Sequence, residues 1–170
     1  MPRVDQSTIN WAVYEDNTEY AGMAQATLPN LTALTQSISG AGIAGNVDAV
    51  ILGHFDAMSM TLNYRTMTEQ AVRLPRRHNI DLRYAVQDED PVAAAVQIRA
   101  IKHILVVIPK THTPGTVAPA TPENGTGEFA VRYWATYIDG KKVREIDPLN
   151  FICLIDGTDY LADVRKALGK

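Results

Sequence analysis

The chain has 170 residues, of which 46% are hydrophobic and 21% are charged, and its formal net charge is −3. This length is enough for one domain with its own core, and the composition is typical of a soluble globular protein. The mild acidity and the lack of clustered Lys and Arg argue against tight nucleic-acid binding, because such affinity comes from basic side chains that displace counterions from phosphates.

The single cysteine, Cys153, rules out an internal disulfide. It lies in the apolar run NFICLID, which predicts a small buried side chain rather than a nucleophile, since no histidine is near in the sequence. The first 16 residues lack the apolar core of a signal peptide, and the longest apolar run is too short to cross a bilayer. We therefore expect a protein that is made in the cytoplasm and stays soluble.

Two strands are predicted within residues 9–31. Trp11 and Val13 recur with a period of two, as in a strand with one buried face. The polar cluster at residues 15–18 supplies a turn between the strands. Pro29 is predicted to end the second strand, because proline cannot donate a hydrogen bond to a ladder.

Residues 32–47 are polar, small and glycine-rich, and they predict a long loop or arm that extends over about residues 32–50. The segment contains Gly40-x-Gly42-x-x-Gly45, the spacing of dinucleotide-binding loops. That fingerprint needs a buried strand before it and a helix after it, whose N-terminus holds the pyrophosphate. Here the preceding residues are polar and the following run, NVDAVILG, is β-branched. We therefore interpret the glycines as a flexible bend and predict no nucleotide cofactor.

The middle of the chain has mixed patterns. Extended structure is predicted again after the glycines, with alternation of buried Met58, Met60 and Leu62. Thr66 or Thr68 can then cap a short helix, which the proline at position 75 would end.

Residues 87–91, QDEDP, predict an acidic turn. The β-branched run that follows predicts a strand over residues 92–110, although its alanines leave a helix possible at the start. Residues 111–128 hold three prolines and three glycines, and they predict an exposed Pro-rich loop.

The last third has the clearest signals. Residues 129–138 predict a strand, Asp139-Gly140 is a strong hairpin signal, and residues 142–147 predict the returning strand. A further strand follows in NFICLID, and the chain then ends in a helix that Thr158 or Asp159 is predicted to cap. The apolar side and the end of this helix are predicted to be formed by Leu161, Val164, Leu168 and Gly169.

No pattern in the sequence predicts a catalytic residue, a metal site or a cofactor. The histidines are scattered through the chain, at His54, His78, His103 and His112. His54 and Asp56 would share one face of a strand, but two ligands do not make a metal site. The acidic run at residues 88–90 lacks the spaced ligands of a calcium loop, and no serine lies in a nucleophile elbow.

Two parts of the chain resemble a known family. ATLPNLT (26–32), SGAGIAGNVD (39–48) and DAMSM (56–60) resemble the N-terminal half of the major tail tube protein of contractile-tailed phages, a family that R-type bacteriocins also use. The run YIDGKKVREIDPLNFICLIDGTDYLADVRKALG is similar to the end of that family, with Glu-Ile-Asp-Pro-Leu-Asn as its most specific part. The resemblance leaves out the middle of the chain, residues 63–127.

The resemblance implies a single domain over residues 1–170, mainly β (a β-sandwich or barrel), with a flanking α-helix and an extended Gly-rich arm. Subunits of this family form hexameric rings that stack into a rigid hollow tube. The implied partners are further copies of the chain, the surrounding sheath protein, and baseplate and tail-terminator proteins. The implied interface residues lie in the arm: Gly40, Ala41, Gly42, Ile43, Gly45 and Asn46.

The resemblance also implies a place and a task. In a phage, DNA would pass through the lumen without specific binding. The protein would belong to a virion tail or to a released phage-tail-like particle, assembled in the bacterial cytoplasm without a membrane anchor. No catalysis is involved. A phage tail and an R-type bacteriocin are not distinguished at this point, and a type VI secretion tube is a less favoured variant.

Two other classes of function remain open from the residues alone. A non-catalytic β-sandwich module could present aromatic side chains to a ligand, although core packing and subunit contacts are commoner uses of such residues. An enzyme with a spatially assembled site would need a deep pocket with convergent titratable groups. The aromatic residues on predicted strands are Trp11, Tyr14, Tyr133, Trp134 and Tyr137.

Overall fold

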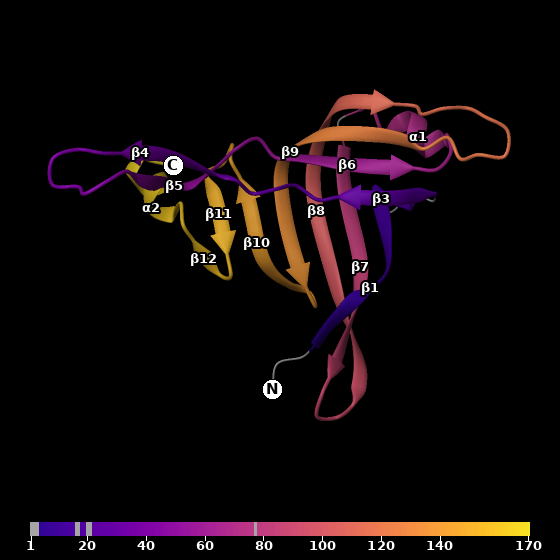
Figure 1. Cartoon of the computed structure of the whole chain (residues 1–170), viewed down its shortest axis with the longest axis horizontal. Coiled ribbons are helices and arrows are strands. Elements are labelled where there is room, and N and C mark those ends of the chain that lie inside the picture. Colours follow the sequence, from indigo (N-terminus) through magenta and orange to yellow (C-terminus); the bar gives the residue numbers. More distant parts are fainter. Residues whose placement is uncertain (1–3, 16–17, 20–21, 77) are drawn as a thin grey trace.

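The computed structural model describes residues 4–15, 18–19, 22–76 and 78–170, and it consists mostly of strands (Figure 1). The strands are β1 (Val4–Glu15), β2 (Thr18–Glu19), β3 (Met23–Thr27), β4 (Ala33–Ile38), β5 (Val47–Phe55), β6 (Ser59–Tyr64), β7 (His78–Asp90), β8 (Ala95–Thr113), β9 (Gly125–Ile138), β10 (Lys141–Asp147), β11 (Ile152–Ile155) and β12 (Thr158–Asp159). The helices are α1 (Glu69–Arg73) and α2 (Ala162–Ala167). The prediction of a mainly β protein with a helix near its C-terminus is therefore confirmed. Neither helix is long and apolar enough to cross a membrane, within the part of the chain that is described.

Most strands belong to one antiparallel sheet in the order β12-β11-β10-β9-β8-β7-β1-β2. The sheet divides at β9, because the first half of β9 pairs with β6 and the second half pairs with β10, while β8 runs along its other side. β3 pairs with the far edge of β6. The β3–β6 pair therefore crosses over the upper ends of β7 and β8 (Figure 1).

The hydrophobic core fills the space under this crossing. Met58, Met60 and Leu62 are at most 4% exposed, so the alternation that the sequence shows is confirmed. Helix α1 covers one end of the core with Ala71, and its cap is Thr68, whose Oγ1 accepts the Ala71 N–H at 3.1 Å. The β7–β9 side of the core is formed by Ile80, Leu82, Leu105, Val107, Phe129 and Val131.

The C-terminal third follows the sequence prediction except at the start of its helix. Asp139 and Gly140 both have positive φ, 47° and 81°, as a tight hairpin turn requires. The prediction that Thr158 or Asp159 caps the helix is wrong, because both residues form β12 and the helix begins after Leu161 without a side-chain cap. Asp159 instead accepts the Leu161 N–H at 3.1 Å and stabilises the turn before the helix.

Three predicted loops are shorter in the structure, because strand pairing extends into them. Most of the loop predicted over residues 32–50 is an antiparallel hairpin of β4 and β5, and only Thr32 and residues 39–46 lie outside its strands. The Pro-rich loop spans residues 114–124, not 111–128, because β8 continues through Thr113. The acidic residues 87–90 belong to β7, the turn falls at residues 91–94, and β8 begins with no helix.

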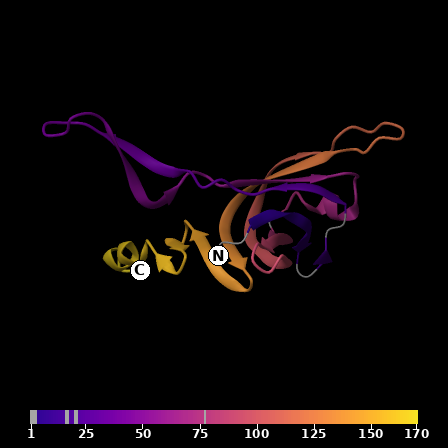
Figure 2. The same cartoon turned by 60° about the horizontal axis from the view of Figure 1, so that its bottom comes forward.

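Three segments project from the body of the molecule. The arm, residues 33–55, extends to the left in Figure 1, and the Pro-rich loop, residues 114–124, extends to the right at the opposite end. The stalk, formed by residues 4–10 and 85–99, points downward. A view turned by 60° keeps the arm and the Pro-rich loop at opposite ends (Figure 2). Surfaces that could meet another molecule are therefore spread over three directions.

Candidate assembly surfaces

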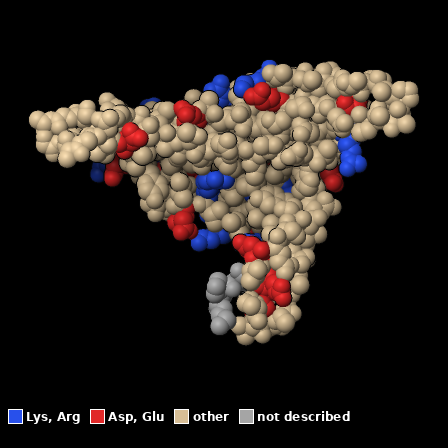
Figure 3. Space-filling view, viewed as in Figure 1, with Lys and Arg blue, Asp and Glu red and all other residues tan. Residues whose placement is uncertain are grey.

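The arm exposes apolar side chains and almost no charge. Asp48 is the one Asp, Glu, Lys or Arg among residues 33–55, and Figure 3 shows a mostly uncharged surface at this end. A two-stranded hairpin is at best marginally stable in water without a partner surface, and an apolar patch of this kind marks an interaction site. Its exposed large apolar side chains are Leu34, Ile38, Ile43, Val47, Val50, Ile51 and Leu52, each at least 39% exposed.

The base of the arm is fixed to the C-terminal segment. Gly53 has a φ of +64°, and a Cβ added there would lie 2.6 Å from Cγ of Leu161, which is 2% exposed. The glycine therefore lets the backbone of β5 lie directly on the leucine side chain. The Asp56 N–H donates to the Thr32 carbonyl at 2.8 Å and closes the base of the hairpin. This contact sets where the arm leaves the body.

The glycine motif lies at the tip of the arm. Gly42 and Gly45 have positive φ, 89° and 142°, and the Ile43 N–H donates to the Gly40 carbonyl at 3.1 Å to form a turn. The motif leads into a strand and not into a helix, so the local structure is not that of a dinucleotide-binding loop. The structure brings the six predicted interface residues together on this exposed tip: Gly40, Ala41, Gly42, Ile43, Gly45 and Asn46.

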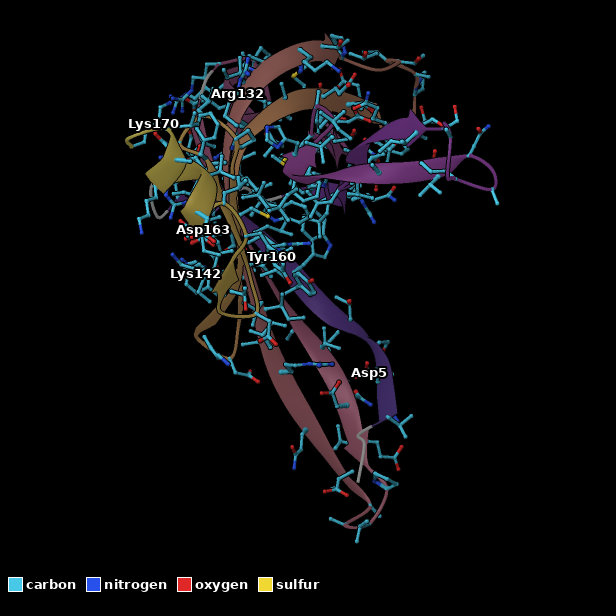
Figure 4. The ribbon with its side chains drawn as sticks, turned by 90° about the vertical axis from the view of Figure 1, so that its left-hand side faces the viewer. Asp5, Arg132, Lys142, Tyr160, Asp163 and Lys170 are labelled. Atoms are coloured by element: carbon cyan, nitrogen blue, oxygen red, sulfur yellow. The ribbon has the colours of Figure 1, made fainter. Side chains whose placement is uncertain are left out.

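The stalk is a second exposed surface, which the sequence reasoning missed. Asp88 is 1% exposed, and it accepts a hydrogen bond at 2.8 Å from Arg99. Arg99 also donates to Asp5 at 2.7 Å, which ties β1 to the hairpin of β7 and β8; Asp5 is labelled on the stalk in Figure 4. The stalk exposes Val4, Ile9, Val92, Val96 and Ile98. The Val96-x-Ile98 alternation, a few residues after the acidic run that ends at Asp90, is the sequence signal for it.

The Pro-rich loop is held firmly at its base. The Glu123 carboxylate accepts the Met67 N–H at 2.7 Å, and the Asn124 N–H donates to the Arg65 carbonyl at 3.1 Å. Gly125 lies against the ring of Tyr64, where an added Cβ would come within 2.1 Å of a ring carbon. Above this base the chain is exposed, and Val117 is 88% exposed. The loop is thus a fixed projection with an apolar tip.

A polar network is buried in the main sheet. Trp134 Nε1 donates to His103 Nδ1 at 3.2 Å, so the imidazole proton lies on Nε2, which donates to Tyr84 at 3.1 Å. Thr136 Oγ1 lies 2.9 Å from the same Nδ1 and accepts from Arg144 at 3.0 Å. Burial, followed by the nearby Arg144 charge, lowers the pKa of His103 to about 4. The network therefore holds a neutral histidine at physiological pH, and we interpret it as part of the packing of the sheet.

A hollow of about 780 Å³ lies beside this network, but its lining does not favour catalysis. Its ionisable lining includes Arg83 and Lys102, both of which are paired with Asp81, at 2.5 Å and 3.3 Å. Among the lining residues that the structure describes, Glu19 is the one carboxylate, and none is a histidine or a cysteine. Among the described residues no three His, Cys, Asp or Glu side chains are grouped as a metal site would need.

The other residues singled out in the sequence are separated in space. Cys153 is buried, as expected, and burial raises the pKa of its thiol. His54 Nδ1 hydrogen-bonds to the Leu52 carbonyl at 2.8 Å within the arm. Trp134 is 3% exposed beneath the Arg144 guanidinium, which lies 3.6 Å from its ring centroid. The five aromatic residues therefore do not form one exposed platform, and that part of the ligand-binding hypothesis is wrong.

Comparison with known proteins identifies a family. A family model described as phage tail tube protein FII matches residues 5–169. The match therefore includes residues 63–127, which the resemblance in the sequence had left out. A search of curated proteins found no match to the chain.

Proposed function

We propose that this chain, which belongs to the phage tail tube protein FII family, forms hexameric rings that stack into the inner tube of a contractile tail. Membership of the family makes it a structural subunit of a phage tail tube and a component of a multi-subunit tail. The number of copies in a ring, the stacking of the rings and the surrounding sheath are the proposal. The role requires no catalytic residue and no cofactor.

The observation that carries the proposal is the arm. It exposes seven large apolar side chains and a single carboxylate on a two-stranded hairpin, and such a hairpin gains stability when another molecule covers it. Because the base is fixed at Gly53 and Leu161, the arm is presented in one direction and can meet the same surface on every copy. A repeated contact between unlike surfaces builds rings or filaments.

The edges of the main sheet support the same proposal. The sheet ends at β12 on one side and at β1–β2 on the other, and no further strand of the described chain pairs with either edge. Open edges pair readily with strands of another chain. Pairing of one edge with the opposite edge of the next copy would continue the sheet around a ring and close it around a lumen.

The remaining parts of the proposal concern the setting of the tube. Baseplate and tail-terminator proteins would bind its two ends, and a sheath would surround it. In a phage, DNA would pass through the lumen, and a chain with a net charge of −3 and no basic stripe would let it slide. An R-type bacteriocin would use the same tube without DNA.

Electron microscopy of the purified protein, alone and with tail initiation components, tests the proposal. Rings with six-fold symmetry or hollow tubes are expected at high protein concentration. Rings with another symmetry would refute the hexamer and keep the tube. Persistent monomers in the presence of baseplate components would refute the assembly itself.

Substitution of the glycines at the tip of the arm is a more local test. Replacement of Gly40, Gly42 and Gly45 by valine should block stacking, because valine does not readily adopt the positive φ of Gly42 and Gly45. The melting temperature of the body should change little, because the strain falls on an exposed tip outside the core, where a new Cβ meets no heavy atom within 4 Å beyond the adjacent residues and the turn can rearrange locally. Gly40→Ala is the matched control and should still stack, as Gly40 lacks a positive φ. Tubes of normal length from the triple variant would refute the role of the tip.

A further inference from the structure

The Pro-rich loop is an ordered projection, and the proposed tube does not yet assign it a function. We propose that the Pro-rich loop of one copy docks on the arm of a neighbouring copy of this chain. The inference rests on the proposed function, because it requires copies that assemble. It names the occupant of the apolar arm as residues 114–124 of the next chain.

The first argument is the construction of the loop. Thr116 N–H donates to the Glu123 carbonyl at 2.9 Å and joins the two sides of the loop, while Glu123 also accepts the Met67 N–H. Prolines at positions 114, 119 and 122 restrict the backbone between these contacts. An ordered segment loses little conformational entropy on binding, so a braced loop with an apolar tip is suited to docking. Val117, at 88% exposed, is the side chain that it offers.

The second argument is that the loop and the arm are both nearly free of charged side chains. Within the loop, residues 114–122 contain no Asp, Glu, Lys or Arg, and Glu123 at its base accepts the Met67 N–H; the arm contains only Asp48. Contact between these two surfaces would bury apolar side chains without leaving a buried charge unpaired, which is the costly outcome at an interface. The stalk fits the loop less well, because it carries Asp5, Glu89 and Asp90 around its apolar side chains. In Figure 3 both ends of the long axis are mostly uncharged.

The third argument is position. The arm and the loop project from opposite ends of the longest axis of the molecule (Figures 1 and 2). A chain therefore cannot cover its own arm with its own loop. Rotation of one copy about a ring axis brings unlike ends of neighbouring copies together, which is the heterologous contact that a ring or a helical stack needs. A second copy is thus the partner that both surfaces fit.

Crosslinking in assembled particles tests the contact. One variant carries Val117→Cys with Val47→Cys, and another carries Val117→Cys with Val50→Cys. Val47 and Val50 are three positions apart on β5, so they sample the two faces of the arm. The native Cys153 is 2% exposed and should not react. A short bifunctional maleimide is added after assembly, and the products are separated on a denaturing gel.

The expected result is a ladder of linked chains from at least one of the two variants. Val117→Cys with Val92→Cys is the matched control, because Val92 lies on the stalk and is 72% exposed; it should give no ladder. Val117→Cys alone should lose its reactivity towards a bulky maleimide when the particles assemble. The arm cysteines alone should show the same loss.

Three outcomes would overturn the inference. The first is the absence of a ladder from both arm positions, and the second is linkage of the stalk pair as readily as the arm pairs. The third is a Val117→Cys variant that stays as reactive in tubes as in free subunits, which would place the loop on the outer surface and make it available to a sheath. Each of these outcomes leaves the tube proposal intact. Failure to assemble refutes the tube proposal, and with it the inference.

Discussion

Gly53 gives the sharpest test of how the arm is fixed to the body. In Gly53→Ala the new Cβ would lie 2.6, 2.7 and 3.0 Å from Cγ, Cδ2 and Cδ1 of Leu161. A side chain at a φ of +64° costs about 1–2 kcal/mol, and forcing extra volume into a packed contact costs about 1–3 kcal/mol more. The expected loss of stability is therefore about 2–5 kcal/mol. For a chain of this length, that loss corresponds to a fall in melting temperature of roughly 5–20 °C.

A double-mutant cycle isolates the contact. Leu161→Ala removes the three atoms that the new Cβ meets, and by itself it costs about 2–5 kcal/mol as a buried leucine. In that background Gly53→Ala should cost only the backbone part, so the two changes should fall short of additivity by about 1–3 kcal/mol. Urea unfolding of the four proteins as unassembled subunits measures this difference. Additivity within about 0.5 kcal/mol would refute the claim that the glycine exists to admit the leucine.

Three further predictions concern the body and the stalk. The pKa of His103 is lowered from 6.5 to about 4, so the unfolded chain binds a proton before the folded chain does as the pH falls. The contribution of His103 to the free energy of unfolding should be constant above about pH 6.5 and decrease by about 3 kcal/mol towards pH 4. Urea unfolding at several pH values measures this dependence, and His103→Gln should flatten it. Asp88→Asn should lower the free energy of unfolding by about 2 kcal/mol, because it weakens a buried contact to Arg99. Asp5→Asn changes a carboxylate that is 74% exposed, and it should lower the same free energy by less than about 1 kcal/mol in urea unfolding. Cys153 is buried, so a chromogenic thiol reagent should not react with it in the folded subunit and should react once per chain after unfolding. Fast reaction of Cys153 in the folded subunit would contradict its burial.

Local patterns in the sequence were sufficient for the body of the fold. Met58, Met60 and Leu62 alternate, and the structure buries all three. Asp139-Gly140 specifies a hairpin through its own backbone preference, so no distant residue is needed to predict that turn. Such signals act over a few residues. They predict the structure correctly here because the tertiary contacts favour the same local conformation.

The arm and the stalk required information that local patterns do not carry. β4 is short and half polar, and it is a strand because residues 47–50 pair with it across an eight-residue tip. The acidic run at residues 87–90 looked like a turn because charged residues favour turns, but Asp88 pairs with Arg99, eleven positions later, and the strand continues past it. The glycine spacing located the tip of the candidate interface, whereas its apolar strands became visible only once their exposure was known.

The join between the arm and the core has a mechanical meaning. Residues 56–58 separate β5 from β6, and the Met58 carbonyl already accepts the Val131 N–H at 2.9 Å. β6 then pairs with β9 at six consecutive positions, from Ser59 with Ala130 to Tyr64 with Gly125. A force that pulls the arm along the axis of β6 would load these hydrogen bonds together in shear, and it would not break them one after another. Tension would pass from the arm into the longest sheet of the subunit with little slack, which suits a part that must transmit force without stretching.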